Sequence, residues 1–515
     1  MRPLLASFLL LSFASAQELH RERFNEGTCR FEGRIQDIIP VDLDNDGRRD
    51  LLVTHAAFPH EGGKMPLRYV SLKWHRPGAP LDGKPDQTWI IPDEAAVLIF
   101  GNYTEAPGTE IGYLCASGAF VWELKGQKYD LLAKRLIMNE TFFDLPQDDS
   151  FPLWWWPLDI DMNGLTDLLL PQHDSYRLYV QTKPGVYGRA ISLSMRNTSK
   201  AEEGGSAFLR VVKSLARVET QDVNGDFRQD VCLIWKDQFI FFLQGTEKVN
   251  GQDAISFPKE PSGQFQLRFL QQKEKKDQIA TAITYLRDLN RGGGVDFIAS
   301  YTRGELANIG AISTDYYMYL GNGGQALANL SPNWRISLPG ISYNPQIEDL
   351  NGDGFDDIVV SSVETGMLSN VGKVAFQSVP ITYYAYLFDR GSQAFSAEYD
   401  FKEVIYVDVD KMNAGGGMPQ LKFGSDFDGD GRRDIMRLDS DGWLSSARGI
   451  TVKTLLKDNP VDYEKTDIFK LNVNDKDEDG KVDAPKGLDI YDLNGDGKAD
   501  VMLRWGDRVR ILVTR

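Results

Sequence analysis

Short apolar runs recur along the chain, and an aspartate stands directly before each of them. Asp50 precedes Leu-Leu-Val, Asp167 precedes Leu-Leu-Leu, and equivalent runs follow Asp230, Asp357 and Asp500. Runs of this length predict buried β-strands. Aromatic-rich segments, which suit a half-buried pleated surface, follow across a turn at 120–122, 178–180, 239–242, 316–320 and 383–388. No stretch between them keeps a helical period, so the pattern predicts an all-β chain.

The polar segment before each apolar run has the form Asp-x-Asp/Asn-x-Asp-Gly-x-x-Asp, whose positions we number 1 to 9. Copies begin at residues 42, 159, 222, 349, 426 and 492. Carboxylates at positions 1, 3, 5 and 9 and a backbone carbonyl at position 7 supply the oxygens that a hard cation such as Ca²⁺ prefers. Glycine at position 6 takes a positive φ at little cost where the loop reverses. Phe227 replaces this glycine in the third copy, which predicts a strained or weak site there.

The sequence thus predicts calcium ligands at positions 1, 3, 5, 7 and 9 of each loop, with the aspartate at position 9 able to bind through both oxygens. They are Asp42, Asp44, Asp46, Arg48 and Asp50; Asp159, Asp161, Asn163, Leu165 and Asp167; Asp222, Asn224, Asp226, Arg228 and Asp230; Asp349, Asn351, Asp353, Phe355 and Asp357; Asp426, Asp428, Asp430, Arg432 and Asp434; and Asp492, Asn494, Asp496, Lys498 and Asp500.

A seventh match begins too close to the Asp492 loop to open a sheet of its own. Its predicted ligands are Asp475, Asp477, Asp479, Lys481 and Asp483. We interpret it as an excursion between strands that calcium closes, with an acidic solvated turn as the alternative.

Two other kinds of loop explain the pattern less well. An EF-hand loop needs a ligand at position 12. That position holds only Val53, Leu170, Leu233, Val360, Arg437 and Leu503. Ordinary Asp-Gly turns would not return six times at regular spacing.

The spacing of the loops counts the repeating units. Two gaps are twice as long as the others, and each contains an eroded copy, at 102–110 and at 288–296. Including both copies gives eight units of about 60 residues, each read as a four-stranded antiparallel sheet. The chain is therefore predicted to be a β-propeller of eight blades, or seven if the unit at 102 is an insertion. A strand near residues 22–24 is expected to complete the final blade and cover its edge.

The N-terminal segment of the chain indicates an exported protein, and the net charge limits its partners. Residues 1–16 combine Arg2, an apolar run from Leu4 to Phe13, and Ala14-Ser15-Ala16, the pattern of a cleaved secretory signal. Residues 17–515 are expected to form a single secreted propeller domain, without a membrane span. The net charge of -17 argues against nucleic acid or an anionic membrane as partner. Cys29, Cys115 and Cys232 predict one disulfide and one buried thiol.

The order of loop, apolar strand and aromatic strand resembles the FG-GAP/VCBS repeat family, whose propellers resemble the head of integrin α subunits. The resemblance covers residues from about 30 to the end of the chain. It implies calcium at the loop positions named above. The family contains adhesion modules, lectins and polysaccharide lyases, and the resemblance implies no catalytic residue here.

Few residues suggest an activity. His55, His60 and Tyr69 are candidates for the acid and base of a lyase, although loop or surface histidines are the favoured interpretation. Trp154, with its two neighbouring tryptophans, is a candidate for stacking on a sugar, although packing between sheets is favoured. The sequence has no nucleophile elbow, zinc helix or phosphate loop. It therefore predicts a calcium-stabilised scaffold that binds glycan or extracellular protein ligands rather than an enzyme. A polysaccharide lyase is the alternative, and the oligomeric state stays open.

Overall fold

The computed structural model describes most of the chain downstream of the predicted signal segment. The described residues are 23–58, 66–146, 148–154, 157–203, 209–235, 238–249, 251–266, 278–305, 308–321, 331–342, 345–363, 378–408, 420–427, 429, 433–440, 448–454, 469–473, 475–476 and 482–515. The predicted signal peptide lies outside them. No helix among them is long and apolar enough to cross a membrane.

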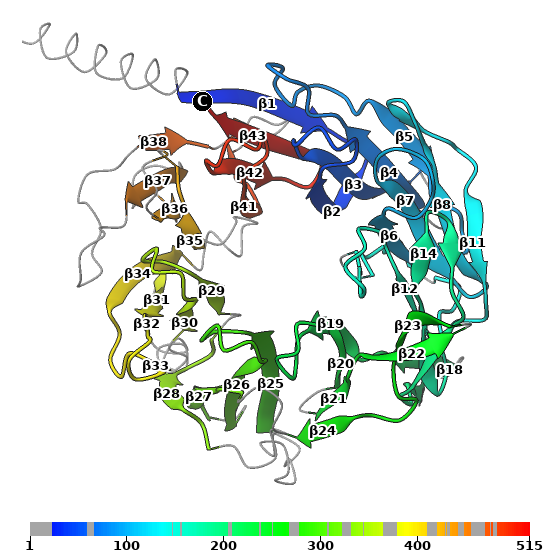
Figure 1. Ribbon diagram of the computed structural model, residues 1–515. Helices are drawn as coiled ribbons and strands as arrows, with labels where there is room; N and C mark the ends of the chain where they lie inside the picture. The colour runs from blue at the N-terminus through cyan, green and yellow to red at the C-terminus, as the bar shows by residue number, and fades with distance from the viewer. Residues whose placement is uncertain are drawn as a thin grey trace, which may run out of the picture. The chain divides into compact units, whose positions relative to one another are not determined.

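The described residues form an all-β chain with a β-propeller arrangement of small antiparallel sheets, as predicted (Figure 1). Seven of these sheets have four strands, which agrees with the lower of the two expected blade numbers. A further sheet of three strands follows the Asp159 loop, at the place of a unit in the count of eight. An isolated antiparallel bridge between Leu158 and Asp167 stands where its fourth strand would pair. Contacts divide the chain into two compact units, described separately below.

The first unit comprises residues 1–90, 340–389 and 395–515 and contains four of the sheets. In order of pairing, they are β2 (Arg34–Val41), β3 (Asp50–Ala57), β4 (Leu67–Lys73) and β5 (Gln87–Ile90); β29 (Gln346–Glu348), β30 (Asp357–Val363), β31 (Ser378–Tyr386) and β34 (Phe401–Asp408); β35 (Gln420–Ser425), β36 (Asp434–Ser440), β37 (Arg448–Thr454) and β38 (Phe469–Asn472); and β1 (Phe24–Arg30), β43 (Arg508–Thr514), β42 (Asp500–Arg504) and β41 (Gly487–Tyr491).

The second unit comprises residues 91–339 and 390–394 and contains the other four sheets. They are β11 (Lys134–Met138), β8 (Gly118–Trp122), β7 (Glu110–Cys115) and β6 (Val97–Gly101); β12 (Leu168–Pro171), β13 (Ser175–Tyr179) and β16 (Ile191–Ser194); β19 (Arg217–Gln221), β20 (Asp230–Trp235), β21 (Gln238–Phe242) and β24 (Gly263–Gln266); and β25 (Gln278–Arg287), β26 (Asp296–Glu305), β27 (Asn308–Tyr319) and β28 (Trp334–Pro339).

Short two-stranded pairs decorate these sheets. They are β9 (Leu124–Lys125) with β10 (Lys128–Tyr129), β14 (Gln181–Lys183) with β15 (Val186–Tyr187), β17 (Thr198–Glu203) with β18 (Leu209–Ser214), β22 (Gly245–Val249) with β23 (Gln252–Ser256), β32 (Phe388–Asp389) with β33 (Ala394–Phe395), and β39 (Asp475–Lys476) with β40 (Val482–Asp483).

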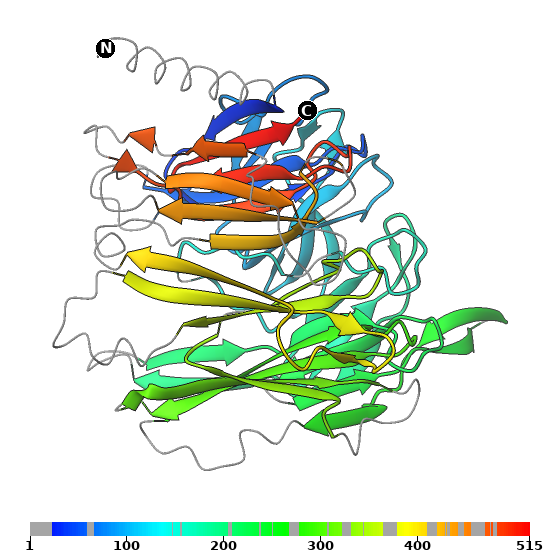
Figure 2. The same ribbon diagram turned by 90° about the vertical axis from the view of Figure 1, so that its left-hand side faces the viewer.

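The prediction that an N-terminal strand completes the final sheet is confirmed. Strand β1 pairs antiparallel with β43, from Phe24 opposite Thr514 to Arg30 opposite Arg508. Figures 1 and 2 show β1, in blue, lying against β43, in red. An exposed sheet edge is a template for aggregation. Strand β1 occupies that edge of the C-terminal sheet.

Apolar side chains fill the space between consecutive sheets within each unit. One cluster joins β1 and β43 to β2 and β3 through residues such as Ile38, Leu51 and Ile511. Another joins β20 and β21 to β26, where Phe239 and Phe297 meet edge to face with ring centroids 5.1 Å apart. Fully burying one such side chain stabilises a fold by about 1.5–3 kcal/mol. The apolar runs after the aspartates therefore supply the cores that hold the loops in place.

The expected disulfide is wrong. All three cysteines are free and buried. Cys29 lies on β1, Cys115 on β7 and Cys232 on β20, each in a different sheet. Each thiol packs as a small apolar side chain, and its sheet supplies no partner.

Candidate metal centres

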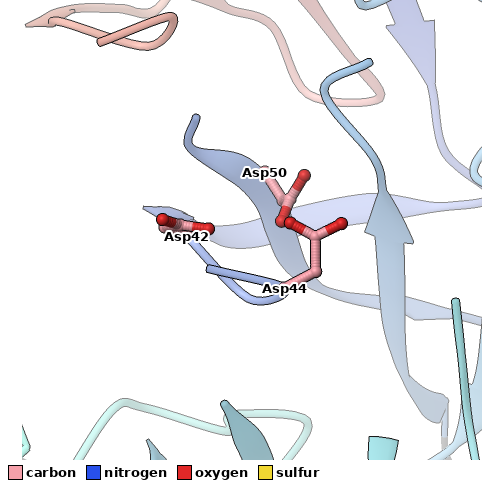
Figure 3. A group of neighbouring side chains, drawn as sticks. All are labelled: Asp42, Asp44 and Asp50. Atoms are coloured by element: carbon pink, nitrogen blue, oxygen red, sulfur yellow. The ribbon is translucent and has the colours of Figure 1, made fainter. Parts of the chain in front are cut away.

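Two of the predicted loops bring three carboxylates together. In the first loop they are those of Asp42, Asp44 and Asp50, and one oxygen from each lies within 4.8 Å of the others (Figure 3). In the second loop Asp159, Asp161 and Asp167 converge in the same way. Both clusters contain positions 1, 3 and 9. At position 5, Asp46 accepts the backbone N–H of Arg48 at 2.8 Å and Asn163 accepts that of Leu165 at 2.8 Å.

The first cluster fits a hard divalent cation. Oδ1 of Asp44 is buried and has no hydrogen-bond partner, so it is an oxygen that still needs a positive neighbour. Burial, followed by repulsion from Asp46 and Asp42, raises the pKa of Asp44. A cation at this point would relieve both effects, because it neutralises charge that the loop gathers and water cannot fully solvate. An all-oxygen donor set of carboxylates is the chemistry that Ca²⁺ prefers.

Asparagine at position 3 behaves differently from aspartate. In three loops its side-chain N–H donates to the carboxylate at position 5, with distances of 2.9–3.1 Å. The residues are Asn224, Asn351 and Asn494, facing Asp226, Asp353 and Asp496. This hydrogen bond from the asparagine amide partly compensates the negative charge of the carboxylate, which a metal ion would otherwise compensate. The Asp42 loop, with aspartate at both positions, is therefore the stronger candidate for metal. In the Asp159 loop the two residue types are exchanged, and the side-chain N–H of Asn163 donates to Asp161 at 3.0 Å.

The carboxylate at position 9 is tied into the sheet by two backbone N–H groups. In Asp500, Oδ2 accepts from Leu493 and Oδ1 from Thr514, both at 2.7 Å. The same two-bond arrangement, one donor at position 2 and one beyond the next strand, holds Asp50, Asp167, Asp230, Asp296 and Asp357. All six are at most 2% exposed. Each carboxylate thus fixes its loop to its own sheet, and both oxygens already have a protein partner before any metal binds.

The eroded copy at 102–110 keeps the position-2 half of this arrangement without the other carboxylates. Glu110 stands at position 9, is fully buried, and accepts the backbone N–H of Tyr103 at 2.7 Å. It opens β7 as the position-9 aspartates open their strands. Tying the loop to the sheet therefore does not require the metal ligands at positions 1, 3 and 5.

A second left-handed position in each loop was missed from the sequence. Besides position 6, position 4 has a positive φ in every described loop of the Asp series, at Asn45, Met162, Gly225, Arg291, Gly352, Gly429 and Gly495. The signal was present in the sequence, because four of these seven residues are glycine and one is asparagine, which adopt this conformation most readily. Met162 and Arg291 hold it at an energetic cost.

Three side chains connect loops of neighbouring sheets. In three loops, the residue beyond the next strand that donates its backbone N–H to the position-9 carboxylate also contacts a second loop through its side chain. Nδ1 of His75 lies 3.0 Å from the carbonyl oxygen of Leu493, and Nε2 of Gln181 donates to that of Asn102 at 2.8 Å. Nε2 of Gln244 donates to the carbonyl of Ile160 at 2.7 Å. Each such bridging residue joins one loop to the loop of the preceding sheet.

We expect Gln244→Leu to destabilise the Asp159 loop, because Ile160 lies between two of its clustered aspartates. Losing the bond leaves a carbonyl unsatisfied and should cost about 1–2 kcal/mol of unfolding free energy. Urea denaturation measures this loss, and calcium affinity at the loop should fall with it. Gln264→Leu is the control, since Gln264 is exposed on β24. Equal stability of the two variants would contradict a bridging role for Gln244.

Several predicted ligands lie outside the described residues. They are Asp428, Asp430, Arg432, Asp477, Asp479 and Lys481. Of the described members of these loops, Asp434 accepts the N–H of Phe427 at 2.7 Å, as a position-9 residue does. Asp483 instead pairs with Arg508 at 2.7 Å, on a short hairpin of β39 and β40.

The histidine and tryptophan candidates pack inside the sheets. His55 is 1% exposed, and its Nδ1 and Nε2 contact the carbonyl of Glu32 at 2.7 Å and the hydroxyl of Ser71 at 2.8 Å. Burial lowers its pKa, and its ring stacks on that of Tyr69 with centroids 5.2 Å apart. Trp154 donates to the carbonyl of Leu169 at 3.2 Å. His55 is an interior residue and Trp154 is half-buried, while His60 and the two following tryptophans lie outside the described residues.

Comparison with known proteins finds solved structures of low similarity. No protein-family model and no curated protein matches the chain. An Agrocybe aegerita lectin that recognises non-reducing terminal N-acetylglucosamine is 14% identical, with a TM-score of 0.38 over 82% of this chain and 85% of the lectin chain. A mutant NanB sialidase from Streptococcus pneumoniae is 12% identical, with a TM-score of 0.28 over 94% and 68%. The Photorhabdus luminescens Tc holotoxin pore is 11% identical, with a TM-score of 0.20 over 93% and 27%. At this level of similarity, none of the three carries an argument about ligand or activity.

Proposed function

We propose that this protein is a secreted, calcium-stabilised β-propeller of the FG-GAP/VCBS type that binds glycan or extracellular protein ligands. The converging carboxylates at the Asp42 and Asp159 loops support calcium as the cation. The buried position-9 carboxylates support a structural role for it, because they tie the loops to the sheets. The metal would then stiffen the loops that connect the strands.

The observation that carries a binding function is the presentation of Phe227. Its side chain is 83% exposed, and its backbone has a φ of 65° at position 6, where the other described loops of the Asp series place glycine. A bulky side chain in the left-handed region costs about 1–2 kcal/mol, and such strain is concentrated at functional sites. Met162, 61% exposed, stands on the loop that Gln244 bonds to the Phe227 loop. Exposed apolar side chains on a rigid loop suit contact with a ligand.

We expect Phe227→Gly to raise stability and lower ligand binding at the same time. Glycine relieves the strained φ, which should add about 1 kcal/mol to the free energy of unfolding. Thermal unfolding measures the first effect, and binding to a panel of immobilised glycans and extracellular matrix proteins measures the second. Arg291→Gly is the matched control. It relieves a φ of 51° in another loop and should raise stability without changing binding.

The same panel tests the proposed function as a whole. Binding should weaken in chelator, because the Asp159 loop, which carries Met162 and is bonded through Gln244 to the Phe227 loop, loses its cation. Absence of binding across the panel, or binding indifferent to both chelator and Phe227, would refute the scaffold. Release of unsaturated sugar products would favour the polysaccharide lyase alternative, for which the buried His55 gives no support.

A further inference from the structure

We infer that the second unit carries a binding site for an acidic sugar, built from Arg303, Asp315 and Arg335 on strands β26, β27 and β28. These residues share one face of a single sheet. Tyr301 stands opposite Asp315, Asp315 opposite Ser337, and Tyr317 opposite Arg335. Directly opposed residues in antiparallel strands project to the same side. The site is separate from the Asp loops.

A buried carboxylate holds the two arginines. Asp315 is 0% exposed, and its Oδ2 lies 3.2 Å from Nη2 of Arg303 and 3.8 Å from Nη2 of Arg335. The hydroxyl of Tyr317 also donates to Oδ2, at 3.3 Å. Oδ1 of Asp315 is buried without a hydrogen-bond partner. Burying this carboxylate costs desolvation free energy, and its contacts with Arg303 and Arg335 hold two positive charges beside it.

The guanidinium groups keep donors for a ligand. The side chains of Arg303 and Arg335 are 54% and 55% exposed, and each guanidinium carries five N–H donors. The guanidinium of Arg335 also lies over the ring of Tyr317, 5.2 Å from its centroid, a contact that attracts the cation to the ring. Two planar groups, tethered on one side and open on the other, match the geometry of a carboxylate or sulfate acceptor.

The charge balance limits the ligand to few anionic groups. Two guanidinium charges and one carboxylate leave a single positive charge in a chain of net charge -17. An extended polyanion would be repelled by the rest of the protein. A ligand with one acid group in a mostly neutral, hydroxyl-bearing frame fits better, because Ser337 and Tyr301 add hydroxyls to the same face. A uronic acid residue of a glycan has this chemistry.

This inference rests on the proposed glycan-binding function and assigns it a second site and a class of sugar. The test compares polyacrylamide conjugates bearing glucuronic acid with matched conjugates bearing glucose, by biolayer interferometry in calcium buffer. The variants are Arg335→Lys and Arg303→Lys, which keep the charge beside Asp315 but lose the planar fork. Arg135→Lys, at an exposed position on β11, is the control.

We expect the glucuronic acid conjugate to bind in preference to glucose, and each fork variant to weaken that binding about tenfold. The control should bind like the parent protein, and thermal midpoints should show that all variants fold. Equal binding of the two conjugates, or a preference unchanged in both fork variants, would overturn the inference and leave the trio as an ion pair that only stabilises the sheet. If neutral glycans bind in a Phe227-dependent way while the arginine variants change nothing, the proposed function stands and this site does not.

Discussion

Asp500→Ala is expected to lower the free energy of unfolding by about 3 kcal/mol in calcium-free buffer. The substitution leaves the backbone N–H groups of Leu493 and Thr514 buried without an acceptor, and each such group costs about 1–3 kcal/mol. Burial raises the pKa of Asp500 to about 7, so removing the carboxyl also removes a desolvation cost, which offsets part of the loss. Urea denaturation measures the change.

Two further variants separate the carboxylate's role in the sheet from metal binding. Asp496→Ala, at the exposed position 5 of the same loop, should cost less than 1 kcal/mol without calcium, since the hydrogen bonds that it removes, from the side chain of Asn494 and the backbone N–H of Lys498, lie where water can replace them. Glu110→Ala should cost about as much as Asp500→Ala, although its loop lacks the other carboxylates. A harmless Asp500→Ala would show that the two backbone bonds do not hold the loop.

Calcium removal is expected to have the second large effect. Extracellular calcium sites have dissociation constants of about 10⁻⁴ to 10⁻³ M. A cation bound only to the folded state then adds about 1.4–2.7 kcal/mol per site at about 10 mM free calcium. The two carboxylate clusters together should contribute about 3–5 kcal/mol, and chelator should remove it. Thermal unfolding with and without chelator measures the difference.

Asp44→Asn sharpens this prediction, because its effect should change sign with calcium. Without the metal, the amide relieves repulsion from Asp42 and Asp46 and should raise the thermal midpoint. With calcium, the loss of a charged ligand should lower it. If Asp44→Asn shifts the thermal midpoint in the same direction with and without calcium, Asp44 does not bind the metal.

The sequence predicts the strand pattern well because the two features that produce it, the apolar runs and the aspartates before them, are local. The apolar runs bury one sheet against the next, and the position-9 aspartates open six strands, among them β3, β30 and β42. The pairing of β1 with β43 was also predictable, since the last loop leaves only two strands after it. Even the eroded copy at 102–110 was recognisable from spacing, although Glu110 replaces the aspartate.

The site was only partly predictable, because several of its interactions depend on residues distant in the chain. Nothing local marks His75, Gln181 or Gln244 as partners of the neighbouring loop. The pattern also treated aspartate and asparagine at position 3 as equivalent ligands, whereas Asn494 bonds to Asp496 in the folded loop. The prediction that the position-9 aspartate binds metal through both oxygens considered only the chemistry of the carboxylate. It left out the two backbone N–H groups that donate to these oxygens in the folded sheet.

The central claim is that the Asp42 and Asp159 loops each hold one calcium ion. Equilibrium dialysis against radioactive calcium, at a fixed free concentration, tests it on the full chain and on the Asp44→Asn, Asp161→Asn double variant. We expect the double variant to bind two fewer ions per chain than the parent protein, one for each cluster. Equal binding by the two proteins, or no binding by either, would contradict the account.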